Sequence, residues 1–197
     1  MNGVSFSRTI AVIAKLAVIL LMHGCSFGNK KIHFEEDVQL ANGEVIKVDR
    51  FIVTKPLGEI GGPGGWEPEY MSLEIASPKH PEDPPKWEST EGLLPILFDK
   101  DPGSGEWALL ATFYTCEPWY ALGRPKLPYA EFRVRNGQWQ RVELSEQWIG
   151  RSANVLTDIS SGGEPDHIGL PMKQERMSDP RTASEYRLIV DRWTTGC

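Results

Sequence analysis

The sequence predicts a mainly β (α+β) fold, with a single antiparallel β-sheet or sandwich domain and a short helical C-terminal part. Three observations predict it. The 197 residues include 19 Gly and 15 Pro, a composition that suits many short strands joined by turns. Two Asn-Gly dipeptides each separate a pair of strand-like runs. Seven Trp and a hydrophobic content of 40% are enough for one core in a chain of this length.

The first Asn-Gly dipeptide predicts a β-hairpin formed by residues 34–40 and 45–54. A two-residue turn at Asn42-Gly43 would fix three cross-strand pairs: Leu40 with Val45, Phe34 with Phe51, and Glu35 with Arg50. Residues 56–68 and 78–86 are rich in Gly and Pro and are expected to be loops. A short strand is expected between them, at 71–76.

The middle of the chain predicts the centre of a sheet. Residues 93–98 are expected to form an edge strand, because Pro95 cannot donate a hydrogen bond to a central ladder. Residues 106–116 are apolar on both faces, as in a strand that is covered on both sides. The second Asn-Gly dipeptide then predicts a hairpin of residues 129–135 and 138–144. A bulge near Gln140-Arg141 would bring Trp139 and Val142 to one face.

The last third of the chain has helical patterns. Residues 145–148 suit one turn ended by Gly150, and residues 171–177 suit a short helix with Pro near its start. Residues 182–185 read as a capping box, and apolar residues then recur at helical spacing, which predicts an amphipathic helix over 183–193. The alternative for this segment is a strand, because Leu188-Ile189-Val190 is also typical of strands.

The N-terminal segment has the features of a secretory signal. Arg8 and Lys15 are its only charged side chains, and residues 16–22 form an apolar run that is too short to span a membrane. The segment ends in Met22-His23-Gly24-Cys25, which resembles the lipobox of bacterial lipoproteins, although His23 departs from the usual small residue. The resemblance implies lipidation of Cys25. The alternatives are ordinary cleavage near Ser26 and an uncleaved anchor helix.

This signal divides the chain into a signal peptide at 1–24, an anchor and linker at 25–32, and one mainly β domain at 33–197. By analogy with lipoproteins, Ser26 carries no retention signal for the inner membrane. We therefore expect palmitate on Cys25, a partner membrane reached through the lipid anchor, and a place at the outer membrane facing the periplasm. The alternative localisation is a soluble periplasmic or secreted form.

The cysteines predict one disulfide bond. Once Cys25 is lipidated, Cys116 and Cys197 are the remaining thiols, and the exported compartment is oxidising. The bridge would close a loop of about 80 residues, worth roughly 4.5 kcal/mol in the chain-entropy treatment. It would join the end of the central strand to the end of the C-terminal helix. Two unpaired thiols are the alternative.

The charge and the motifs argue against several functional classes. The net charge is −6, and an acidic surface repels nucleic acid. Residues 56–68 lack the Gly-Lys-[Ser/Thr] end of a phosphate loop, and Ser160-Ser161 lacks the sequence context of a hydrolase nucleophile. The sequence predicts no catalytic residue, cofactor or metal ion.

Two sets of residues are candidates for binding. His80 with Glu82 and Asp83, and Asp166 with His167, could ligate a metal ion, but in a loop rich in Pro and acidic residues we expect them to be solvated surface. Aromatic side chains beside Pro or Gly could stack on sugars or hold a peptide, unless they belong to the core. This second set is Trp66, Trp119, Tyr120 and Tyr129.

Three segments resemble a group of uncharacterised proteobacterial envelope lipoproteins. They are residues 42–48 (NGEVIKV), residues 127–139 (LPYAEFRVRNGQW) and the closing Thr195-Gly196-Cys197. The resemblance supports lipidation but implies no activity. We therefore expect an envelope lipoprotein that binds or scaffolds a protein or glycan in the periplasm without catalysis. The alternative is an envelope hydrolase acting on cell wall or glycan through carboxylates that the sequence does not single out.

Overall fold

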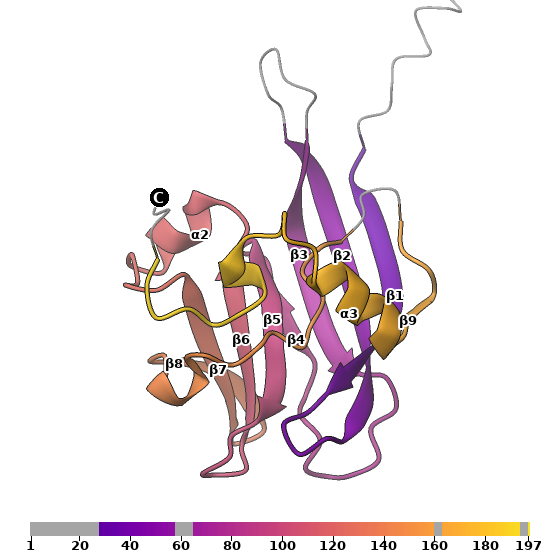
Figure 1. The fold of residues 1–197 in the computed structure, drawn as a ribbon, viewed down its shortest axis with the longest axis vertical. Helices are drawn as coiled ribbons and strands as arrows, with labels where there is room; N and C mark the ends of the chain where they lie inside the picture. Colours follow the sequence, from indigo (N-terminus) through magenta and orange to yellow (C-terminus); the bar gives the residue numbers. More distant parts are fainter. Residues whose placement is uncertain (1–27, 58–64, 160–162, 194–196) are drawn as a thin grey trace, which may run out of the picture.

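The computed structural model describes residues 28–57, 65–159, 163–193 and 197, and these form two antiparallel sheets packed face to face (Figure 1). The mainly β prediction is therefore confirmed, in its sandwich form. Sheet A has the strand order β4-β3-β2-β1-β9, and sheet B has the order β5-β6-β7-β8. In sheet A only the short β9 runs parallel to its neighbour, β1.

The elements have the following bounds. Sheet A contains β1 (Lys30–Gln39), β2 (Val45–Leu57), β3 (Gly65–Ile75), β4 (Trp87–Ser89) and β9 (His167–Ile168). Sheet B contains β5 (Leu93–Lys100), β6 (Trp107–Phe113), β7 (Tyr129–Arg135) and β8 (Gln138–Val142). The helical elements are α2 (Cys116–Ala121), α3 (Leu170–Met177) and the 3₁₀ turns η1 (Glu146–Trp148) and η2 (Ser184–Tyr186). Among the described residues, no helix is long and apolar enough to cross a membrane.

The first predicted hairpin exists, but its predicted register was wrong by one residue. Gln39, not Leu40, lies opposite Val45. Leu40 belongs to the turn, where its N–H donates to the Glu44 carbonyl at 2.8 Å while its side chain is buried. A shift of one residue exchanges the faces of one strand relative to the other. Arg50 is consequently opposite Phe34, and both point into the core.

The predicted loop at 56–68 was wrong at both of its ends, which belong to strands. β2 continues to Leu57 and β3 begins at Gly65, so only residues 58–64 of that stretch lie outside the described residues. Pro68 is tolerated because β4 pairs only with Met71, Ser72 and Leu73, which leaves the earlier part of β3 as a sheet edge. The strand predicted at 71–76 is the second half of β3.

Sheet B follows the sequence predictions closely. β5 is an edge strand whose register shifts between Pro95 and Leu97, and every residue of the central β6 is buried. The second hairpin has a two-residue turn in which Asn136 and Gly137 both have positive φ, at 54° and 72°. The bulge predicted near Gln140-Arg141 was wrong, because the pairing runs without a shift.

The C-terminal part contains less helix than predicted. The turn at 145–148 and the helix at 171–177 are confirmed as η1 and α3. The helix predicted over 183–193 was wrong: only η2 is helical, and Thr182 does not cap it. The segment instead bonds to residues 150–153, with the Ile189 N–H donating to the Arg151 carbonyl at 2.9 Å. This arrangement carries Ile189 into the apolar cluster that covers the outer face of sheet B.

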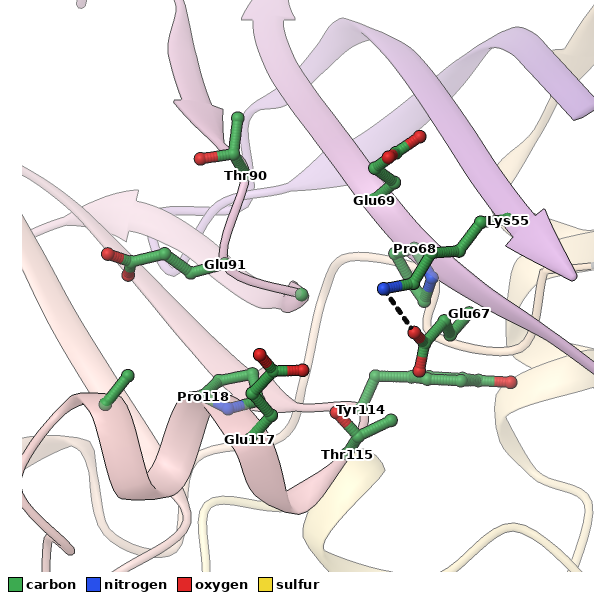
Figure 2. Close-up of a pocket in the computed structure, with 12 residues that line it drawn as sticks. Lys55, Glu67, Pro68, Glu69, Thr90, Glu91, Tyr114, Thr115, Glu117 and Pro118 are labelled. Carbon is green, nitrogen blue, oxygen red and sulfur yellow. Dashed lines mark ion pairs between the residues drawn. The ribbon is translucent and has the colours of Figure 1, made fainter. Parts of the chain in front are cut away.

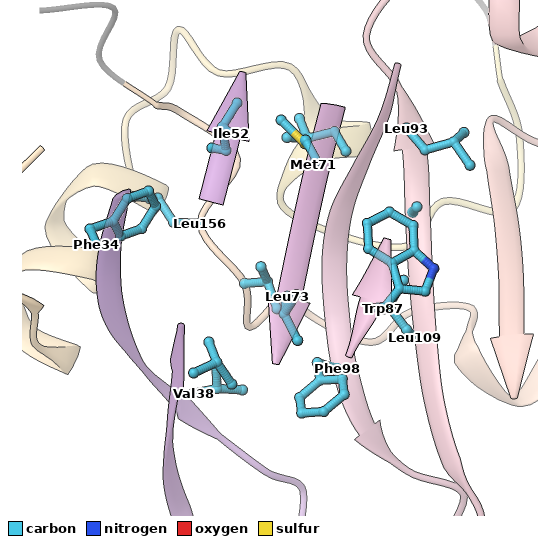
Figure 3. Packing of buried hydrophobic residues seen from close by; sticks show 14 of the residues in the cluster. Phe34, Val38, Ile52, Met71, Leu73, Trp87, Leu93, Phe98, Leu109 and Leu156 are labelled. Atoms are coloured by element: carbon cyan, nitrogen blue, oxygen red, sulfur yellow. The ribbon is translucent and has the colours of Figure 1, made fainter. Parts of the chain in front are cut away.

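The main core fills the space between the two sheets (Figure 3). Leu73 of sheet A and Phe98 and Leu109 of sheet B belong to this core, Phe34 lies beside Leu156, and Trp87 packs edge-on against Phe132. A second cluster lies on the other face of sheet B, where Leu110 contacts the layer formed by Trp148 and Ile189. Sheet B is thus covered on both faces, which explains why all of β6 is buried.

A cluster of three charged side chains, Arg50, Glu36 and Lys173, is buried where α3 packs on sheet A. Arg50 Nη1 donates to Glu36 Oε1 at 2.6 Å, and both side chains are fully buried. Lys173 of α3 lies 3.5 Å from the other oxygen of Glu36 and donates to the carbonyls of Asn154 and Asp37. These two hydrogen bonds and the ion pair with Glu36 tie α3 to β1 of sheet A.

Candidate functional site

An apolar cleft lies between the two sheets at the end of the sandwich where β1 begins, with a volume of about 430 Å³. Sheet A overhangs sheet B there, because β2 and β3 have 13 and 11 residues whereas β5 and β6 have 8 and 7 (Figure 1). The inner face of the overhang therefore has no strand of sheet B opposite it. We call this space the interlayer cleft.

The floor of the interlayer cleft is apolar. Ile32, Ile52 and Met71 line it from sheet A, and Leu94 lines it from sheet B; each is at most 5% exposed. These four side chains belong to three strands of one sheet and the edge strand of the other. Because they are part of the folded core, the floor is rigid and preformed, as in most small-molecule sites.

The rim of the interlayer cleft is aromatic and partly polar. Trp66 is half-buried, and Tyr114 is 44% exposed. The Lys30 ammonium lies 4.3 Å from the centre of the Trp66 ring, within the range of a cation–π contact. Asp158 adds a carboxylate to the same rim. Partial burial and the nearby Glu67 carboxylate both raise the pKa of Tyr114, so its hydroxyl is neutral at physiological pH.

One hydroxyl inside the interlayer cleft lacks a partner. Thr54 is 7% exposed, and its Oγ1 makes no hydrogen bond within the described part of the chain. Buried polar atoms are normally paired, so this hydroxyl is free to bond a ligand or a water molecule. A mostly apolar pocket with one or two polar groups is the usual composition of a ligand site.

A smaller acidic pocket of about 230 Å³ adjoins the interlayer cleft (Figure 2). Pro68 and Tyr114 line both spaces. Four glutamates from three separate segments surround the pocket, and they are Glu67 and Glu69 of β3, Glu91 after β4, and Glu117 of α2. Lys55 pairs with Glu67 at 2.7 Å, and that hydrogen bond and charge raise the pKa of Lys55. The other three side chains are exposed, so the pocket presents negative charge to solvent.

The predicted disulfide is confirmed, and it supports the wall of the acidic pocket. Cys116 and Cys197 are bonded, with their Cα atoms 5.3 Å apart. The elements that they join differ from the prediction: Cys116 begins α2 instead of ending the central strand, and the helix predicted before Cys197 is not formed over residues 187–193. The Tyr120 hydroxyl also donates to the Cys197 carbonyl at 3.1 Å. The chain end is thereby tied to α2, whose Glu117 and Pro118 line the pocket.

The four aromatic residues singled out in the sequence have different environments. Trp66 belongs to β3 and reaches the cleft, whereas Trp119 and Tyr120 belong to α2. Tyr129 is 2% exposed, and its hydroxyl accepts from the Val190 N–H at 3.0 Å and donates to the Leu188 carbonyl at 3.1 Å. Burial raises the pKa of Tyr129 to about 12. Tyr129 is therefore a core residue and not a binding surface.

His167 and His80 each contact an aspartate, His167 through its ring and His80 through its backbone N–H. His167 lies 2.9 Å from Asp37, and the Asp83 carboxylate accepts from the backbone of Lys79 and His80 within one turn. Within the described ranges, no three His, Cys, Asp or Glu side chains are grouped so as to hold a metal ion. Two further predicted positions, Cys25 and Ser160-Ser161, lie outside the described residues.

The sequence reasoning missed both spaces. Residues 56–68 were expected to be a loop, so the overhang of β2 and β3 and its empty inner face were not foreseen. The composition of the segment did hold one signal: Trp66 stands in a stretch otherwise typical of loops. The glutamates of the acidic pocket are separated along the chain and come together only through the fold.

Comparison with known proteins adds no relative. No protein-family model, no curated protein and no solved structure matches this chain. The likeness to proteobacterial envelope lipoproteins stays a prediction from the sequence.

Proposed function

We propose that the chain is an envelope lipoprotein that binds a ligand without catalysis, and that the interlayer cleft is its binding site. The single observation that carries the proposal is the cleft itself: a preformed space of about 430 Å³ with an apolar floor and one unpartnered hydroxyl. That volume lies within the ordinary range for small-molecule sites, about 300–1,000 Å³.

The physical advantage of the cleft is that its apolar floor needs no rearrangement to receive a ligand. Each methylene group that leaves water for such a surface contributes about 0.8 kcal/mol. The side chains of Ile52, Met71 and Leu94 are already ordered by the core, so little conformational entropy is lost on binding.

The lipoprotein half of the proposal rests on the signal that ends at Cys25. Cells given labelled palmitate should incorporate it into the wild-type chain and not into Cys25→Ser, and the wild-type chain should fractionate with the outer membrane. If the wild type takes up no lipid label, the lipobox interpretation is wrong and a soluble exported form is the better description.

The binding half is tested by placing a photoreactive amino acid at Ile159, which lines the cleft at its rim. The matched control is the same amino acid at Val45, which is 46% exposed at the turn end of β2. Irradiation of whole cells should give a defined adduct at Ile159 and none at Val45. Equal adducts at both positions would show that the cleft has no special affinity.

A second candidate function, hydrolysis of a glycan, is favoured by the acidic pocket. Glycosidases use two carboxyl groups on opposite sides of the bond that is broken, and Glu91 and Glu117 come from different segments around one space. The test is release of reducing ends from purified cell wall by the wild type and by Glu117→Gln. Activity lost in the variant would support hydrolysis, and no release by the wild type would dismiss it.

A further inference from the structure

We propose that the interlayer cleft takes one acyl chain of a membrane phospholipid, drawn from the bilayer to which the chain is anchored. This inference rests on the proposed function, since it requires a lipid anchor at Cys25. It specifies the ligand class of the cleft and the direction from which the ligand enters.

The lining of the cleft matches an unbranched hydrocarbon. Ile32, Ile52, Met71 and Leu94 offer no polar side-chain atom, and the Thr54 hydroxyl is the one buried polar side-chain group lacking a partner among the residues that line the space. A sugar or a peptide would bring several donors and acceptors into this lining and leave them unpaired, at about 1–3 kcal/mol for each group. An acyl chain brings none, so the Thr54 hydroxyl is the one polar group of the buried lining that it leaves to a water molecule.

The short segment between Cys25 and the start of β1 would place the cleft beside the membrane. Asn29 Nδ2 donates to Glu69 of β3 at 2.6 Å, and β1 begins at the next residue, Lys30. The chain therefore joins the fold at the same end as the cleft, whose floor includes Ile32. Four residues from Cys25 to Asn29 span at most about 14 Å even when fully extended. A lipid on Cys25 would hold Asn29 within about that distance of the bilayer surface, on the end of the fold where the cleft opens.

The residues at the mouth suit an interface between water and lipid. Trp66 and Tyr114 both line the cleft and both keep part of their surface exposed. Trp and Tyr are enriched at membrane surfaces because each has an apolar body and a polar end. Charges of both signs surround them, with Lys30 over Trp66, Lys55 paired to Glu67, and Asp158 at the rim. The mouth thus favours no single headgroup, and recognition rests on the acyl chain.

The test uses the full lipidated chain in vesicles of a phosphatidylcholine whose acyl chain carries a diazirine near its methyl end. After irradiation, peptide mass spectrometry should locate adducts on Ile52, Met71 and Leu94. Ile159→Arg places a charge at the rim and should reduce these adducts at least tenfold. Val45→Arg, which introduces the same charge at the end of β2 away from the cleft, should leave the number of adducts unchanged. Formation of the Cys116–Cys197 bond and an unaltered circular dichroism spectrum would show that each variant is folded.

Two results would overturn the inference. Adducts confined to Trp66, Tyr114 and other exposed side chains would mean that lipid touches only the surface. In a second arm, the diazirine is carried by the anchor on Cys25 and the vesicles are unlabelled. Adducts on the cleft floor in that arm would assign the cleft to the protein's own anchor instead of a membrane phospholipid.

The proposed function can fail separately from this inference. If the chain does not float with vesicles and takes up no lipid label, the lipoprotein assignment fails. The cleft is then tested with a short-chain form of the same photoreactive lipid, free in solution. Adducts on Ile52, Met71 and Leu94 would still assign an acyl ligand, and their absence would reject it.

Discussion

Replacing Leu110 by Asp should unfold the domain. Leu110 is fully buried at the centre of β6 and packs against the cluster that contains Trp148 and Ile189. Its partner across the ladder is Glu131, which is also fully buried and whose two oxygens already accept from Arg133 and from the Ser145 N–H, each at 2.6 Å. A new carboxylate at this position would therefore meet a like charge on the same face. The donors nearby, Arg133 and the Ser145 N–H, already bond to Glu131.

The cost can be estimated from these contacts. Loss of the leucine side chain from a packed site costs about 2.7–5 kcal/mol. A buried carboxyl without a partner adds about 1–3 kcal/mol even when it is neutral, and more when it is charged. The total is similar to the whole stability of an ordinary domain, about 5–15 kcal/mol.

The assay is urea unfolding followed by tryptophan fluorescence, with Leu110→Met as the control of similar volume. Leu110→Met should cost less than about 1.5 kcal/mol. Leu110→Asp should show no cooperative transition or be degraded in the cell. A normal midpoint for Leu110→Asp would mean that β6 has an open face and is not covered on both sides.

Three further perturbations test other parts of the structure. Cys197→Ser should lower the free energy of unfolding by up to roughly 4.5 kcal/mol of loop entropy, and the melting temperature with it. It should also expose the C-terminal segment to protease first, and an unchanged digestion pattern would contradict this. Arg50→Met should cost about 3 kcal/mol in urea unfolding because Glu36 would stay buried without its closest partner, whereas Arg50→Met combined with Glu36→Leu should recover part of that loss. Burial raises the pKa of Asp101, but hydrogen bonds from Ser104, Gln147 and Gly103 outweigh it and hold the pKa well below its ordinary value. Its contribution to stability should therefore be present above about pH 4, the unfolded value, and fade below it, and Asp101→Asn should flatten that acid dependence in melting temperature measured from pH 7 to pH 2.

The predictions that succeeded depend on local chemistry. The turn at Asn136-Gly137 needs two residues that tolerate positive φ, and the dipeptide names them directly. Pro95 lacks an N–H, so its strand had to lie at an edge. The apolar residues on both faces of β6 required two covering layers, and the core and the outer cluster supply them. The pairing of Cys116 with Cys197 followed from counting thiols.

The predictions that failed depend on the tertiary context. At Leu40 the burial of one side chain enlarged the first turn and shifted the register of the whole hairpin. Tyr186, Ile189 and Val190 have helical spacing, but backbone bonds to residues 150–153 give this segment an extended partner instead. Pro68 argues against a strand only where that strand is central, because proline is tolerated at the edge of a sheet. Composition does not reveal that this part of β3 lies at an edge. The interlayer cleft depends on the relative lengths of strands in two sheets, which no local pattern encodes.

The central claim is that the interlayer cleft holds an acyl chain, and a nuclear Overhauser measurement tests it most directly. The full lipidated chain would be placed in nanodiscs, with protonated methyl groups on Ile, Leu and Met in a deuterated background. If an acyl chain fills the cleft, cross-peaks should join lipid methylene protons to the methyl groups of Ile52, Met71 and Leu94, which line the cleft floor. Cross-peaks from these methyl groups only to water and to one another would contradict it.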